Sequence, residues 1–258
     1  FAGLGSVSMW RADLKNIDGP SEPKLPVPVT LLQTIFCFLK VDEEADPLHY
    51  HHVCIKGALL TGFWFLLRSI EYLADDSGYF DPDRSLTWGD VSCRKDGHII
   101  PLFRIAEADT ICLTVYSGNN SLETCTRSLA RVPGSDVCVV AALAAVYAAH
   151  RVTFKSHPRE GDAVFKKNKT AAITRREIST LLKLAADGCG IPHARIASHS
   201  LRRGGATQFV ASGLSDEHTM RHGRWTSTAY RAYVFGHSEA MKAALMKAVH
   251  LVPCLERN

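Results

Sequence analysis

Several familiar signatures are missing from this 258-residue chain. Its eight cysteines form no C-x-x-C pair, which argues against a zinc site and for reduced intracellular thiols without disulfides. The chain has no G-x-G-x-x-G, Walker or H-E-x-x-H motif, so neither a nucleotide loop nor a zinc protease is indicated. Its longest apolar run, "GALLTGFWFLL" from Gly57 to Leu67, is too short to cross a bilayer, and no signal peptide is visible.

The charge that is present is unevenly distributed. Residues 1–150 hold 12 Lys/Arg and 18 Asp/Glu, a net charge of −6, whereas residues 151–258 hold 18 and 8, a net charge of +10. Clustered positive charge attracts polyanions and gains free energy from counterion release. The basic half therefore suggests a surface that faces nucleic acid, and an uneven but solvated surface is the alternative.

Residue patterns predict one domain that is mainly α with a small antiparallel β-sheet (α+β). Residues 1–28 are rich in Gly, Pro and Ser and indicate a linker, so we expect the domain to cover 29–258. Four short β-branched segments between residues 85 and 131 predict the sheet. Helical spacing recurs over 30–40, 48–73, 136–150, 174–187, 200–212, 215–222, 226–234 and 238–250.

The segment "SHSLRRGG", residues 198–205, carries two arginines and a histidine with no acidic residue. His199 and Arg202 are three residues apart, so they share a face if a helix begins here. Arg68 lies in an apolar helical stretch, where a buried cation needs a partner. Two guanidinium groups beside an imidazole suit the oxygens of a phosphate. The alternatives are an Arg68–Glu71 ion pair, and a His199 that caps the helix or belongs to the core.

A second cluster, "RHGRWTSTAYRAY" over residues 221–233, places tyrosines among arginines. A phenol is mostly neutral at pH 7, so a tyrosine nucleophile needs neighbouring cations or a base. Taken alone, each of Tyr230 and Tyr233 is better explained as a core residue with its hydroxyl at the surface.

In order along the chain, these residues resemble the catalytic domain of the tyrosine recombinase (phage integrase) family, over about residues 25–250. "LLRSIEYL" looks like the first arginine box of that family, and "HSLRRGGAT" is similar to its H-x-L-R box. Trp225 follows Arg202 by 23 residues, and Tyr233 follows 8 later, as in the family. The tryptophan in "GRWTSTAYRAY" looks most like recombinases of eukaryotic mobile elements.

The resemblance implies cleavage and rejoining of double-stranded DNA without metal or cofactor. Tyr233 would attack a backbone phosphate and form a 3′-phosphotyrosyl link. Arg68 and Arg202 would hold the non-bridging oxygens, as electrostatic stabilisation of the transition state requires. The remaining expected roles are proton transfer by His199, positioning of the phosphate by Trp225, support from Glu71 and His222, and a second candidate nucleophile in Tyr230.

One element of the family pattern is absent. The resemblance places a lysine on a hairpin of the sheet, where it protonates the leaving oxygen, but this chain has Gly118 or Asn119 there. The nearest cations are Lys95 on another turn and Arg127 downstream. Two readings stay open, an active recombinase and a DNA-binding domain whose chemistry has decayed. A phosphohydrolase of small phosphoesters is a third, disfavoured by the basic C-terminal half.

Further expectations concern partners. The cations expected to grip DNA phosphates are Lys166, Lys167, Lys169, Arg175, Arg176, Arg203 and Arg224. A solvated loop is the alternative for "KKNK". The resemblance also implies a missing N-terminal DNA-binding domain and a C-terminal helix, 238–250, that docks on a neighbouring protomer in a DNA-dependent homo-oligomer. We expect no membrane contact and an intracellular location, nuclear if the host is a eukaryote.

Overall fold

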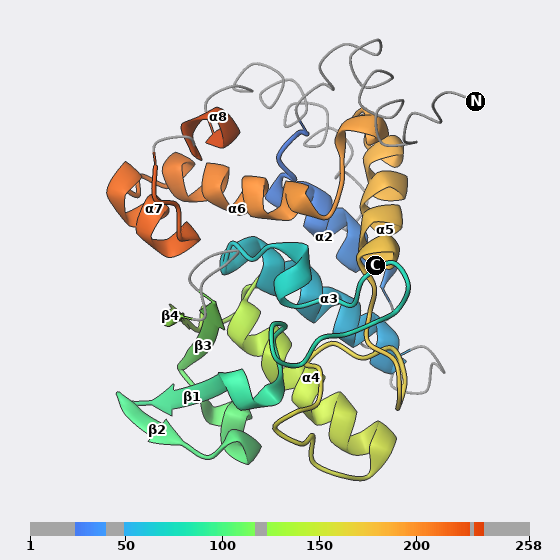
Figure 1. The fold of residues 1–258 in the computed structure, drawn as a ribbon, viewed down its shortest axis with the longest axis vertical. Coiled ribbons are helices and arrows are strands. Elements are labelled where there is room, and N and C mark those ends of the chain that lie inside the picture. The colour runs from blue at the N-terminus through green and yellow to red at the C-terminus, as the bar shows by residue number, and fades with distance from the viewer. Residues whose placement is uncertain (1–23, 40–48, 117–122, 228–229, 235–258) are drawn as a thin grey trace, which may run out of the picture.

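The computed structural model describes residues 24–39, 49–116, 123–227 and 230–234 (Figure 1). The helices are α2 (Val29–Phe38), α3 (His49–Trp64), α4 (Val139–Phe154), α5 (Arg175–Gly188), α6 (His199–Ala211), α7 (Asp216–Gly223) and α8 (Arg231–Val234). The strands are β1 (Val91–Lys95), β2 (His98–Ile100), β3 (Thr110–Tyr116) and β4 (Thr124–Ala130). The 3₁₀ helices are η1 (Ser69–Glu71), η2 (Trp88–Asp90), η3 (Leu102–Glu107) and η4 (His193–Arg195). The predicted fold class is confirmed.

The four strands form one antiparallel sheet in the order β2-β1-β3-β4. Its inner strand β3 is largely buried, whereas β4 at the edge alternates between exposed and half-buried residues. Such alternation is expected where one face of a sheet meets the core and the other meets water. The register places Arg127 of β4 opposite Leu113 of β3.

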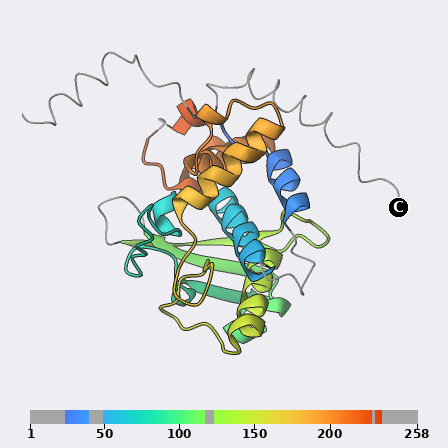
Figure 2. The ribbon, with the colours of Figure 1, turned by 90° about the vertical axis from the view of Figure 1, so that its right-hand side faces the viewer.

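Helix α3 lies at the centre of the fold. Figures 1 and 2 both place α6 and α7 on one side of α3, and α4 with the sheet on the other. The sequence of α3 is apolar on most faces, from Val53 to Phe63, which is typical of a helix surrounded by protein. A Cβ added at Gly205 of α6 would overlap the carbonyl oxygen of Phe63 in α3, so this glycine sets how closely the two helices approach.

The predicted helix over 48–73 is wrong beyond residue 64. Helix α3 ends at Trp64, and Leu66 adopts a left-handed conformation with φ of 52°. Arg68 then has extended dihedrals and begins the turn η1. The apolar spacing continues past the true end because Leu66, Leu67 and Leu73 are buried after the helix has stopped. Arg68 therefore projects from a turn, not from a helix.

Other boundaries also differ from the sequence expectation. The last residues of the predicted linker belong to the fold, because the N–H groups of Leu25 and Val27 donate to the carbonyls of Arg195 and Ser200, and both side chains are buried. The predicted helix over 226–234 is reduced to α8. Residues 1–23 and 238–250 lie outside the described residues. In the described part of the chain, no helix has both the length and the apolar character that a bilayer span requires.

We expect Gly205→Ala to destabilise the fold by about 1–3 kcal/mol, because the added methyl must push α6 away from α3. Urea unfolding followed by circular dichroism measures this. Gly188→Ala, at the end of α5 with open space around it, is the matched control and should change stability by under about 1 kcal/mol. Equal effects of the two variants would contradict the close approach.

Candidate active site

The candidate site begins at the first turn of α6. His199 is the first residue of this helix, and Arg202 lies one turn later. The predicted helix start is thereby confirmed, and the two side chains share one face. Arg202 is only 1% exposed, so its positive charge is held inside the protein.

The guanidinium of Arg202 is held by the segment that follows α7. Its Nη2 donates to the carbonyl oxygen of Gly223, and its Cζ lies 4.5 Å from the centroid of the Trp225 ring. A cation over the face of tryptophan is attracted by the ring quadrupole. A Cβ at Gly223 would overlap the indole, so glycine is required for the ring to lie here. Trp225 therefore orients Arg202, a contact that the sequence did not predict.

Arg68 is paired with Glu71, as the alternative reading of the sequence held. Its Nη1 donates to Oε1 of Glu71 at 2.9 Å, and its backbone N–H donates to Oε2 at 2.7 Å. The Arg68 side chain is still 26% exposed, whereas that of Glu71 is 10% exposed. The ion pair thus orients the guanidinium without removing it from the surface.

The pKa of His199 is shifted by burial and by the arginines around it. Burial first, and neighbouring positive charges second, lower its pKa from 6.5 to about 4. In decreasing order of effect, these charges belong to Arg202, Arg203 and Arg68. Arg68 precedes His199 by 131 residues, so the fold brings two distant segments together at this imidazole. His199 is neutral at pH 7 in this environment.

The C-terminal turn of α7, residues 221–225, joins the segments of the site; we call it the α7 turn. His222 Nε2 donates to the Trp64 carbonyl at 2.9 Å, which ties the turn to the end of α3. From the sheet, Arg127 donates to the carbonyls of Arg221 at 2.7 Å and His222 at 3.3 Å. Burial and nearby arginines lower the pKa of His222, so it serves as a neutral donor.

Arg224 also belongs to the α7 turn, and its surroundings correct a prediction. From the sequence, Arg224 is expected on the DNA-binding surface. Its side chain is only 2% exposed, and its Nη2 donates to Oε2 of Glu71 at 2.7 Å. The same Nη2 reaches the carbonyl of Leu66 at 3.3 Å. Arg203, expected to bind DNA as well, is buried at 7% exposure.

The two candidate nucleophiles lie at α8. Tyr230 is fully buried against Trp225, with ring centroids 5.6 Å apart, and burial together with Asp216 raises its pKa. A raised pKa disfavours the phenolate that attack requires. Tyr233 belongs to α8, but its side chain lies outside what the structure describes.

Helix α8 is attached at two places. Val234 packs in a cluster with Leu66 and Ala206, which places α8 beside α6 and the end of α3. Arg231 pairs with Asp216 at 2.7 Å, which ties α8 to the first turn of α7. The backbone that carries Tyr233 is therefore held next to the segments that carry the arginines.

Most of the other expected DNA-binding cations surround the start of α5. Lys169 and Arg176 are exposed, and Arg175 is half-buried. Lys167 pairs with Glu177 at 3.4 Å. Lys166 is only 13% exposed and pairs with Asp162 at 3.2 Å, so it acts inside the fold.

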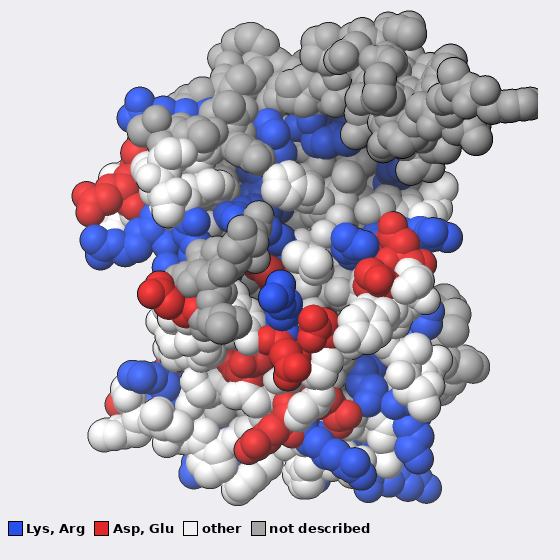
Figure 3. Space-filling view, in the orientation of Figure 1, with Lys and Arg blue, Asp and Glu red and all other residues white. Residues whose placement is uncertain are grey.

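The surface charge follows the division of the chain. Figure 3 shows Lys and Arg gathered over α6 and α7, with Asp and Glu gathered below them, between α3 and the sheet. A duplex that approached the face with α6 and α7 would meet the positive region.

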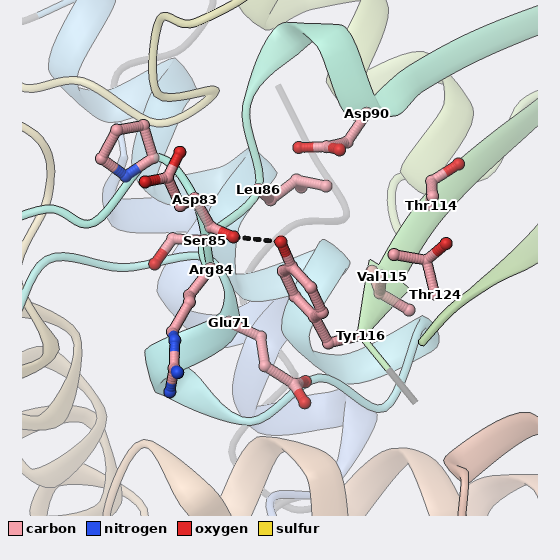
Figure 4. Close-up of a pocket in the computed structure, with 11 residues that line it drawn as sticks. Glu71, Asp83, Arg84, Ser85, Leu86, Asp90, Thr114, Val115, Tyr116 and Thr124 are labelled. Carbon is pink, nitrogen blue, oxygen red and sulfur yellow. Dashed lines mark hydrogen bonds between the residues drawn. The ribbon is translucent and has the colours of Figure 1, made fainter. Parts of the chain in front are cut away.

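A small polar pocket adjoins the buried side of Glu71 (Figure 4). It encloses about 50 Å³ and is lined by Glu71, Asp83, Asp90 and Tyr116 among others. The Tyr116 hydroxyl donates to the Asp83 carbonyl and so fixes the end of β3 against the loop before β1. Among the described residues, no group of three or more His, Cys, Asp and Glu side chains is placed to hold a metal ion.

The sheet supplies one cation to the site. Lys95 of β1 pairs with Glu107 at 3.5 Å. It lies at the end of β1 that faces away from the β3–β4 hairpin, so roughly 20 Å along the strand direction separate Lys95 from that hairpin. Arg127 reaches the α7 turn, where its donors are taken up by backbone carbonyls. Gly118 and Asn119 lie outside the described residues.

Comparison with protein-family models gives no match, and neither does comparison with curated proteins. Solved structures of the Tn1549 transposon integrase are similar to the chain. One, in complex with circular intermediate DNA, is 14% identical over 93% of this chain and 74% of its own, with a TM-score of 0.41. Another, a Y379F variant with transposon right end DNA, is 15% identical over 89% and 67%, with a TM-score of 0.43.

We expect His199 to titrate near pH 4, measured by NMR of its imidazole. Because the pKa of His199 is lower in the folded state than the unfolded value of 6.5, the unfolded state binds this proton at a higher pH than the folded state does. His199 therefore contributes a loss of stability as pH falls from about 6.5 to 4. His199→Gln should make urea stability less dependent on pH in this window. An imidazole that titrates near 6.5 would refute the buried, positively charged surroundings.

Proposed function

We propose that the chain cleaves and rejoins DNA strands through a 3′-phosphotyrosyl intermediate. The observation that carries this proposal is that α6, which begins at His199 and carries Arg202, packs closely at Gly205 against the end of the helix that leads to Arg68. Both arginines lower the pKa of His199. Two guanidinium groups and an imidazole offer donors to the oxygens of one phosphate. The family pattern quoted above adds Tyr233, whose backbone lies on α8 beside α6.

In the proposed reaction the Tyr233 oxygen attacks the phosphorus of a backbone phosphodiester. The bond between phosphorus and Tyr233 forms while the bond to the 5′ oxygen breaks. The phenol loses its proton, and the leaving oxygen gains one. Arg68 and Arg202 stabilise the charge that develops on the non-bridging oxygens. The reverse attack by a 5′ hydroxyl restores the DNA. The proposed reaction therefore requires neither a metal ion nor a nucleotide.

The surroundings of His199 and Trp225 suit defined tasks in this reaction. With its pKa lowered to about 4, His199 is neutral at pH 7 and can accept a proton. A bound phosphate would offset the arginine charges and raise that pKa, which prepares the imidazole to return the proton. Trp225 holds Arg202 in place through its ring face.

The second candidate function is DNA binding by a domain that has lost its chemistry. It is favoured by the hairpin, whose sequence lacks the lysine of the family, and by Arg127, whose donors face carbonyls. Loss of a general acid typically lowers a rate by about 10²–10⁴-fold. A slow recombinase and a binding-only domain are therefore separated by whether a covalent adduct forms.

The remaining elements of the proposal rest on the sequence. They are a further N-terminal domain that completes the grip on DNA, docking of residues 238–250 on a second copy in a DNA-dependent homo-oligomer, and an intracellular location, which is the nucleus if the host is a eukaryote. The exposed Lys169 and Arg176, and the half-buried Arg175, contribute phosphate contacts.

We expect a duplex with a nick near the scissile phosphate to trap a covalent adduct, visible as a shifted band on a denaturing gel. Tyr233→Phe should abolish the adduct, because the nucleophilic oxygen is removed. Tyr230→Phe is the matched control and should keep the rate within about tenfold. An adduct that survives Tyr233→Phe, or none at any protein concentration, would reject Tyr233 or the chemistry itself.

Binding to DNA should weaken steeply with salt if phosphate contacts dominate. The double variant Lys169→Gln, Arg176→Gln should reduce the slope of log affinity against log salt by about 2, one unit for each lost contact. Lys166→Gln is the control, because it breaks an internal pair with Asp162. It should lower the urea midpoint and leave the salt slope unchanged. An unchanged slope in the double variant would exclude Lys169 and Arg176 from the DNA interface.

A further inference from the structure

Arg224 occupies a backbone conformation that an arginine rarely adopts. It caps the C-terminus of α7 with φ of 59° and ψ of 40°, in the left-handed region that favours glycine. Leu66, at the end of α3, is left-handed as well, with φ of 52°. Strained residues of this kind persist where the surrounding structure holds them, often at functional sites. The Nη2 group of Arg224 bonds to the carbonyl of Leu66, so it joins these two positions.

The burial of Arg224 is costly by itself. Its side chain is 2% exposed, and Nε and Nη1 have no hydrogen-bond partner among the described residues. A buried donor without a partner costs about 1–3 kcal/mol. A glycine at this position would relieve both the backbone conformation and the burial. An arginine here therefore points to a task beyond capping the helix.

That task is visible at Glu71. Oε2 of Glu71 accepts from the backbone N–H of Arg68 and from Nη2 of Arg224, both at 2.7 Å, whereas Oε1 accepts from Nη1 of Arg68 at 2.9 Å. A carboxylate frequently binds an arginine through both oxygens, side by side. Because Arg224 occupies Oε2, the Arg68 side chain makes a single bond to Glu71 and keeps donors for another anion.

We propose that Arg224 is a positioning residue, which acts through Glu71 to hold Arg68 in a phosphate-accepting orientation. The inference rests on the proposed function in that it assigns the anion to a DNA phosphate. Arg224 does not itself touch the phosphate. It also links the two halves of the site, because the α7 turn carries Trp225 and the carbonyl that holds Arg202.

Inorganic phosphate is a suitable probe, because its binding needs the site but not the cleavage chemistry. Its affinity is measured at constant ionic strength from the NMR shift of the His199 imidazole. The test variant is Arg224→Gly, which suits the left-handed backbone. Arg224→Lys keeps the charge, and it serves if the glycine variant does not fold. Arg221→Ala is the matched control, since this exposed arginine lies on the same turn and pairs with the exposed Glu217.

We expect Arg224→Gly to weaken phosphate binding by about tenfold, as loss of one charge-assisted hydrogen bond would, and Arg224→Lys by about threefold. Arg221→Ala should stay within about twofold. In an Arg68→Met background, Arg224→Gly should cause no further loss, because its effect passes through Arg68.

A folded Arg224→Gly or Arg224→Lys chain that binds phosphate as tightly as the unmodified one overturns the inference. So does a loss that adds in full to that of Arg68→Met. An unmodified chain that binds phosphate but traps no covalent adduct refutes the cleavage chemistry alone, and these variants still decide the role of Arg224. A chain that binds no phosphate refutes both.

Discussion

The organisation of the site depends on buried positive charge, which exceeds the buried negative charge among the described residues. Among the buried Asp, Glu, Lys and Arg residues that the structure describes, three are arginines (Arg202, Arg203 and Arg224) and one is acidic, Glu71. Charges removed from water are costly unless they are paired. Burial, and after it the charges of Arg202, Arg203 and Arg68, lower the pKa of His199. A bound anion would reduce the imbalance, so the same arrangement that costs stability in the free protein favours binding of a phosphate.

The charges keep their places because helix ends, not helix faces, meet at the site. Helix α3 ends at Trp64, α7 ends at Gly223, and α6 begins at His199. Carbonyls at the ends of α3 and α7 accept from side chains of the site, which satisfies groups that a helix end otherwise leaves open. Gly205 and Gly223 supply the close approaches that this convergence needs. The side chains of the candidate site are therefore also part of the contacts that hold these helix ends together.

The sequence predicts the fold class and most helices, because apolar spacing along a helix is a local signal. It also predicts that His199 and Arg202 share a helix start and that Arg68 pairs with Glu71. In both cases the two residues are three positions apart in the sequence. It fails at Leu66, where burial continues after the helix ends. It fails again at Arg203, Arg224 and Lys166, because residue type indicates a charge but not its burial. The contact of Arg224 with Glu71 spans 153 residues and has no local signature.

Helix α7 connects the two sides of the site at both of its ends. Asp216 in its first turn holds Arg231 of α8, and Arg224 at its far end holds Glu71. The helix is eight residues long, about 12 Å. Inserting or deleting one residue would rotate one end against the other by about 100° and break one of the two attachments. The length of α7 is thus fixed more strictly than the identity of its exposed residues, so that homologous chains should vary here by substitution and not by insertion.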